Sequence, residues 1–155
     1  MTSRLAVLDA SPLIAFHQIG RLDLVRHVYD TVIVPPAVSH EIAPSLGTLP
    51  SWVQVTRPAL IPTMLLDLDP GEQEAIALAV QLDADVIVLD DLAARRAATR
   101  MGLTLTGSAG LLVRAQRLGL LEVVRPDLDA MIANGLFISE SLYRDVLQSL
   151  GELSP

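Results

Sequence analysis

The stretch Val86-Ile87-Val88-Leu89-Asp90-Asp91 decides the fold, because a wholly apolar run is followed directly by two acidic residues. A short apolar run rich in β-branched residues is typical of a strand buried on both faces of a sheet. A second run of this kind, Leu5-Ala6-Val7-Leu8, ends directly at Asp9. The two runs therefore predict buried strands of a parallel sheet, each with an Asp at its carboxyl end.

Outward from these runs, strand patterns alternate with helical patterns along the whole chain. Further strands are expected at Thr31–Val34, which is β-branched, at Trp52–Val55, which alternates like an edge strand, and at Leu103–Leu105. The alternation predicts an α/β fold with a parallel or mostly parallel sheet. Neither a linker nor a repeat interrupts it, so one domain over residues 1–155 is expected. Helices are predicted at 12–19, 22–28, 37–42, 70–82, 92–101, 108–118, 127–133 and 139–150.

Local signals mark where several of these helices begin. Asp69-Pro70-Gly71-Glu72 predicts a helix start, with Asp69 as the cap and Glu72 placed for a capping box. Ser11-Pro12 predicts a cap followed by a first-turn proline. Gly107-Ser108 predicts the start of a later helix. Capping therefore offers a structural reason for several of the polar residues considered below.

Charge and composition exclude several classes of function. The chain of 155 residues has a net charge of −7 and no cysteine, and all of its basic residues other than histidine are arginine. Without lysine, a P-loop NTPase, Schiff-base chemistry and a phosphoryl-aspartate receiver are disfavoured. An acidic chain gains no long-range attraction to phosphates, unless a divalent cation supplies local positive charge. No apolar run is long enough to cross a membrane, no signal peptide is apparent, and cytoplasmic residence is expected.

Asp9 and Asp90 are the first candidates for chemistry. If both strands belong to one parallel sheet, both carboxylates emerge at its carboxyl edge, where open α/β sheets bind ligands. Two carboxylates at one edge repel each other unless a cation or proton lies between them, and oxygen ligands favour Mg²⁺ or Mn²⁺. The alternative is that each Asp caps the helix that follows. Asp91 has four open roles: ligand, ligand through water, helix cap, or ion-pair partner of Arg95.

Three glutamates add to this acidic set. Glu41 lies one to two turns into the predicted helix 37–42. This position fits either a solvated residue or a functional one. Glu72 has a structural role in the predicted capping box. Glu74 has no such role and heads an apolar segment, so it needs a partner, either a metal ion or an arginine.

Other polar residues carry weaker signals. His17, His27 and His40 lack metal-ligand spacing. Ser11 and Ser108 have positions from which a metal-bound water could be held, although capping explains both. Arg95, with Arg96 and Arg100 on the same predicted helix, either guides a phosphate backbone or forms a solvated helical face.

Together, these pieces resemble the PIN domain. Asp90-Asp91 with Arg95, Gly102-Leu103 and Thr106–Leu112 is similar to the prokaryotic DUF3368 group of PIN-like domains, and the resemblance covers nearly the whole chain. The stretches that carry the wider resemblance are 7–14, 34–42, 71–79 and 88–91.

This resemblance implies a three-layer α/β/α fold and a Mg²⁺- or Mn²⁺-dependent ribonuclease that cleaves single-stranded RNA. The implied acids are Asp9, Glu41, Glu74 and either Asp90 or Asp91. Many relatives are toxins held by a small antitoxin protein, and homodimers are common. The chain lacks the usual Thr-x-Asp form at the fourth acid and has Glu in place of Asp at position 74. A PIN-like module that binds an antitoxin or RNA without cutting is the alternative.

Overall fold

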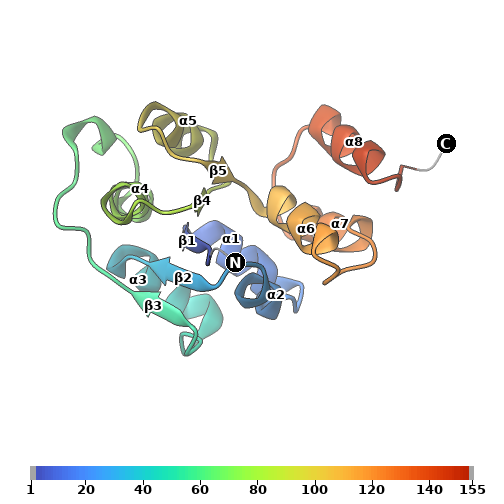
Figure 1. Cartoon of the computed structure of the whole chain (residues 1–155), viewed down its shortest axis with the longest axis horizontal. Helices are drawn as coiled ribbons and strands as arrows, with labels where there is room; N and C mark the ends of the chain where they lie inside the picture. The colour runs from blue at the N-terminus through green and yellow to red at the C-terminus, as the bar shows by residue number, and fades with distance from the viewer. Residues whose placement is uncertain (1–2, 154–155) are drawn as a thin grey trace.

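A five-stranded, wholly parallel sheet forms the centre of the protein in the computed structural model, which describes residues 3–153 (Figure 1). The strands are β1 (Leu5–Leu8), β2 (Thr31–Val34), β3 (Val53–Val55), β4 (Val86–Val88) and β5 (Leu105–Thr106). The helices are α1 (Ala10–Gln18), α2 (Leu22–Val28), α3 (Pro36–Leu46), α4 (Pro70–Leu82), α5 (Leu92–Arg100), α6 (Ser108–Arg117), α7 (Arg125–Ala133) and α8 (Glu140–Ser149), with a 3-10 turn, η1 (Thr63–Leu65). The predicted α/β class is confirmed.

The strand order β3-β2-β1-β4-β5 places the two apolar runs side by side. Leu8 is in register with Val88, and Leu5 with Thr31 on the other side. The chain moves outward from β1 to β3, then returns to the far side of β1 and moves outward again. The boundary between β1 and β4 is therefore a topological switch point, where open α/β sheets form ligand crevices beyond the carboxyl ends of their strands.

Helices cover both faces of this sheet. The helices α4 and α5 lie on one side, while α1, α2 and α6 pack against one another on the other side (Figure 1). The helix α3 contacts both α1 and α4, so it joins the two layers. Fully buried side chains such as Leu8, Phe16 and Ile87 fill the interior. This three-layer arrangement fixes the positions of the strand ends that carry the acidic residues.

Several element boundaries differ from the predicted ones. The helix α1 begins at Ala10 with Asp9 in the N-cap position, so the prediction that Ser11 caps it is wrong. The helix α3 continues through Pro44 instead of ending near Ile42. Pro44 leaves a carbonyl of the preceding turn without a donor, but His40 and Pro44 are both exposed, so water can satisfy it. The predicted capping box of α4 is confirmed.

No helix in the part of the chain that the structure describes is long and apolar enough to span a bilayer.

Candidate metal centre

Asp9 and Asp90 emerge at the same edge of the sheet. The strands β1 and β4 are parallel neighbours, and the backbone N–H of Asp9 donates a 3.1 Å hydrogen bond to the carbonyl of Val88. Asp9 is buried, with 5% of its surface exposed, whereas Asp90 is half-buried. The strand pattern thus predicted correctly that the two residues lie at one end of the sheet rather than at opposite ends.

Three carboxylates converge around Gly71, in the first turn of α4. A Cβ atom built on Gly71 would lie 3.0 Å from Oε1 of Glu41, 3.5 Å from Oδ1 of Asp9 and 3.6 Å from Oδ1 of Asp69. These groups come from β1, α3 and the start of α4, which are far apart in the sequence. The absence of a side chain at Gly71 leaves the space in which they meet.

The environment of Asp9 and Glu41 favours their protonated forms. Burial raises the pKa of Asp9 from 3.8 to about 7, with smaller contributions from the charges of Asp69, Glu41 and Asp90. Burial is also the main reason that the pKa of Glu41 is raised, with Asp69 adding to it. The charges therefore repel one another at neutral pH, and a cation placed among them would relieve this repulsion.

Glu72 lies among the acidic side chains, whereas the sequence predicted only a capping role for it. Its backbone N–H donates to Oδ1 of Asp69 at 2.9 Å, and its Oε1 accepts from the backbone N–H of Asp69 at 3.4 Å. Glu72 is nevertheless buried, and burial followed by the charges of Asp69, Asp91 and Asp9 raises its pKa. A capping glutamate is usually exposed, so the apolar residues that follow Glu72 are the signal that could have revealed its burial.

Glu74 has a hydrogen-bond partner in the backbone of α3. Its Oε1 accepts a 3.1 Å hydrogen bond from the backbone N–H of Ala37, in the first turn of α3. A helix start has N–H groups without intrahelical acceptors, and a carboxylate is a favourable partner for them. Neither a metal ion nor an arginine is therefore needed to explain Glu74, which joins α4 to α3.

Asp90 and Asp91 have distinct local roles. Asp90 accepts hydrogen bonds from both the backbone N–H and the hydroxyl of Ser108, at 2.7 Å and 2.6 Å, which ties β4 to the start of α6. Asp91 caps α5 by accepting from the backbone N–H of Ala94 at 3.0 Å. Of the alternatives open for Asp91, the helix cap is therefore present, while its charge also acts on Glu72.

The predicted substrate-contacting residues lie around this centre. Ser11 is exposed and lines a groove that also contains Asp90 and Asp91. Arg95 donates from Nη1 to the carbonyl of Leu89 at 2.8 Å, and the described residues show no ion pair between Arg95 and Asp91. Ser108 is fully buried, and it contacts Asp90 rather than open space.

The donor chemistry of the pocket fits a hard divalent cation. Asp9, Glu41, Asp69, Glu72 and Asp91 offer only carboxylate oxygens, the ligands that Mg²⁺ and Mn²⁺ prefer. Over residues 3–153, no ion pair to an arginine or histidine neutralises any of these five. No three Asp, Glu or His side chains within this range already lie in metal-ligand geometry. Side-chain rotation would therefore have to accompany metal binding.

Fold and site together define a class: an α/β domain with a carboxylate pocket at the switch point of a parallel sheet. The chain belongs to the PIN-domain family, since residues 5–152 match the DUF3368 group of PIN domains. PIN domains are in general a nuclease fold, and they usually use divalent metal ions.

A solved structure supports the fold independently. A PilT N-terminus domain protein from the hyperthermophilic archaeon Sulfolobus solfataricus superposes with a TM-score of 0.54 at 18% sequence identity. The match covers 77% of this chain and 95% of that chain. No curated protein matches the sequence. At this level of identity, the likeness concerns the fold alone.

Proposed function

We propose that this protein is a Mg²⁺- or Mn²⁺-dependent endoribonuclease that hydrolyses phosphodiester bonds of single-stranded RNA. The observation that carries the proposal is a convergence of carboxylates. Asp9, Glu41 and Asp69 meet around Gly71, and the charges of Asp9, Asp69 and Asp91 act on the buried Glu72. Over residues 3–153, no ion pair to an arginine or histidine compensates them. A buried carboxylate whose pKa is raised to about 7 is costly to ionise and is typical of a functional site. Membership of a nuclease family agrees with this interpretation.

The ligand set that we propose consists of Asp9, Glu72 and Asp91, with Asp90 acting through water. Asp9 and Glu72 are buried, and Asp91 is near enough to raise the pKa of Glu72. Glu74 was the third acid predicted from the sequence, but its Oε1 accepts from the backbone of Ala37 at the start of α3, whereas Glu72 lies among the charges of Asp9 and Asp91. We therefore assign the third acid to Glu72.

A divalent cation bound here would neutralise charge on the scissile phosphate and lower the pKa of an attacking water. Glu41 is exposed, and its raised pKa suits a group that accepts a proton from that water. Asp69 keeps the start of α4 in place through the capping box and adds negative charge beside Glu41.

A direct test is the Asp9→Asn substitution. The variant keeps the size and shape of the side chain but removes its charge, so we expect it to fold and to lose Mn²⁺-dependent cleavage of single-stranded RNA. Circular dichroism checks the fold, and a gel assay checks the cleavage. Full activity of Asp9→Asn would refute the site.

The rival proposal is a PIN-like module that binds an antitoxin or RNA without cutting. The observation in its favour is that residues 3–153 contain no set of three ligands already in metal geometry. Calorimetry with Mn²⁺ separates the two, because a degenerate site should not bind the ion.

The biological setting follows from the family resemblance. We propose that the protein acts in the cytoplasm as the toxin of a toxin–antitoxin pair, held inactive by a small antitoxin protein, and that it forms a homodimer. Sedimentation of the purified protein tests the dimer. Growth arrest on expression of the wild type, but not of Asp9→Asn, tests the toxin role.

A further inference from the structure

Two open grooves border the acidic pocket and share one wall. The first has a volume of about 500 Å³ and the second about 440 Å³, within the range of sites that bind small organic groups. Asp90, Leu92, Leu136 and Phe137 line both grooves. Asp91 also lines the first groove, so this groove adjoins two residues of the proposed metal centre, and a ligand in it would lie beside that centre.

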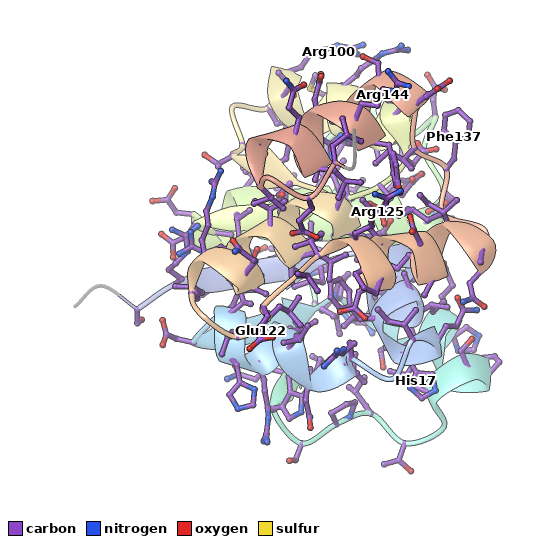
Figure 2. All side chains as sticks on the ribbon, turned by 90° about the vertical axis from the view of Figure 1, so that its right-hand side faces the viewer. His17, Arg100, Glu122, Arg125, Phe137 and Arg144 are labelled. Carbon is purple, nitrogen blue, oxygen red and sulfur yellow. The ribbon has the colours of Figure 1, made fainter. Side chains whose placement is uncertain are left out.

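Phe137 is the most exposed large apolar side chain that the structure describes. It lies between α7 and α8, and 85% of its surface is accessible. Figure 2 shows its ring at the edge of the molecule, directed away from the ribbon. Leu92, on the same shared wall, is 62% exposed. An aromatic ring left in water beside a groove offers a flat apolar surface for a ligand to cover.

The first groove combines apolar walls with amide side chains. Ile14, Ala15 and Met131 provide apolar surface, while Gln18 and Asn134 provide amide groups. Asn134 uses Nδ2 to donate to the carbonyl of Ala130, whereas Gln18 is exposed and its side chain makes no hydrogen bond to the described residues. An amide both donates and accepts, so it can pair with the edge of a nucleobase.

The charge of the groove selects which part of an RNA chain fits it. Asp90 and Asp91 line one side of the first groove, and no arginine lines it. A phosphate group would be repelled there, but an uncharged, planar base with hydrogen-bonding edges would not. Bases of single-stranded nucleic acids are commonly bound by stacking on aromatic side chains.

We propose that the first groove binds an unpaired base of single-stranded RNA next to the scissile phosphate, with the base stacked on Phe137 and its edge read by Gln18. The proposal rests on the proposed nuclease function, because it assigns the groove to the same substrate. Phe137 supplies affinity that does not depend on base identity, since every base has a π-face. Gln18 supplies the preference among bases.

The test measures binding of a fluorescein-labelled single-stranded RNA decamer by anisotropy in Ca²⁺, together with kcat and KM for cleavage in Mn²⁺. We expect Phe137→Ala to weaken RNA binding by about 10- to 100-fold and to raise KM. Phe137→Trp should retain binding, whereas Phe137→Leu should lose it, because leucine keeps apolar area but has no ring face. Leu60→Ala is the matched control, since Leu60 is 70% exposed outside both grooves. Gln18→Ala should alter the ranking of oligo-U, oligo-A and oligo-C.

The outcomes separate this proposal from the nuclease proposal. If Phe137→Ala or Phe137→Leu binds the decamer as tightly as the wild type, base stacking is overturned. Base stacking is also overturned if sedimentation shows that Phe137→Ala only dissociates a dimer, because the ring would then pack against a second copy of the chain. Mn²⁺ calorimetry on Phe137→Ala should match the wild type. If the wild type neither binds Mn²⁺ nor cleaves RNA, the nuclease proposal fails, while RNA binding that depends on Phe137 would still support the groove.

Discussion

The hydroxyl of Ser108 donates a 2.6 Å hydrogen bond to Oδ2 of Asp90, and the backbone N–H of the same serine donates one of 2.7 Å to Oδ1. Both oxygens of Asp90 are thereby fixed at the end of β4, the neighbour of the central strand β1. A charged acceptor strengthens these bonds, and they orient α6 against the sheet. These bonds therefore hold the acidic edge of the sheet in place, in addition to the role proposed for Asp90 at the metal.

Removal of the Ser108 hydroxyl tests how much this contact stabilises the fold. Ser108→Ala leaves one oxygen of the half-buried Asp90 carboxylate with fewer donors, so we expect the free energy of unfolding to fall by about 1–3 kcal/mol. Urea denaturation followed by circular dichroism measures it. Ser141→Ala, at an exposed serine in α8, is the control and should change little. Equal stability of the two variants would show that the hydroxyl bond contributes nothing.

Two isosteric substitutions distinguish Glu72 from Glu74 as the third acid. Glu72→Gln removes a charge from the pocket but keeps a residue that suits a capping box, so the fold should persist. We expect its affinity for Mn²⁺ to drop by about 10- to 100-fold, as when a group that supports a metal site is lost. Glu74→Gln retains an oxygen acceptor for the N–H of Ala37 and should bind Mn²⁺ like the wild type. Calorimetry measures both affinities, and the opposite ranking would restore Glu74 as the ligand.

Gly71→Ala tests whether the space beside Gly71 is the metal site. Alanine is favoured over glycine inside a helix by about 1 kcal/mol. The added methyl group would lie 3.0 Å from Oε1 of Glu41, an exposed side chain that can move aside. We therefore expect unchanged or slightly higher thermal stability with weaker Mn²⁺ binding and slower RNA cleavage. Wild-type affinity for Mn²⁺ in this variant would mean that the ion binds elsewhere.

The raised pKa of Asp9 predicts that the metal-free protein loses stability as the pH rises. The folded state holds the Asp9 proton up to about pH 7, whereas the unfolded chain releases it near 3.8. The stabilisation is therefore complete below pH 3.8 and is lost as the pH rises through about 7. Denaturation in EDTA at pH 5 and pH 8 measures the change, and Asp9→Asn should show a smaller difference between the two. An identical pH dependence in both proteins would contradict a buried, protonatable Asp9.

Bound metal should reverse this trend. Metal binding requires ionised carboxylates, so Mn²⁺ should stabilise the protein more at pH 8 than at pH 6. Thermal denaturation with and without Mn²⁺ at the two pH values measures the difference. Equal stabilisation at both values would argue that the ion does not bind to the carboxylates whose pKa is raised.

The sequence predicted the sheet well because each strand is a local pattern. The runs at Leu5–Leu8 and Thr31–Val34 coincide with β1 and β2, and β4 lies within the predicted run that begins at Val86. The strand predicted at Leu103–Leu105 is displaced, since β5 (Leu105–Thr106) shares only Leu105 with it. The helix start at Asp69 was also predicted, since a capping box depends on residues only three apart. The predicted start of α1 was wrong because two residues could occupy the N-cap position. Ser11 precedes a proline, but Asp9, which directly follows the strand, is the N-cap.

The roles of the glutamates could not be read from the sequence. Glu72 and Glu74 are two positions apart on one helix, which turns their side chains by about 200° relative to each other. One faces the pocket beside Asp9, and the other faces the start of α3. Periodicity indicates that their directions differ, but it does not indicate which direction meets the acidic edge.

The sequence by itself determined that Asp9 and Asp90 follow buried parallel strands, because apolar runs and their ends are encoded locally. Only the tertiary structure decided that β1 and β4 are neighbours and that Gly71 lies against Glu41. It also decided that Phe137 is exposed beside grooves that Asp90 lines. The physical reason is that these relationships arise from the packing of distant segments, and packing depends on every surface that meets in the core.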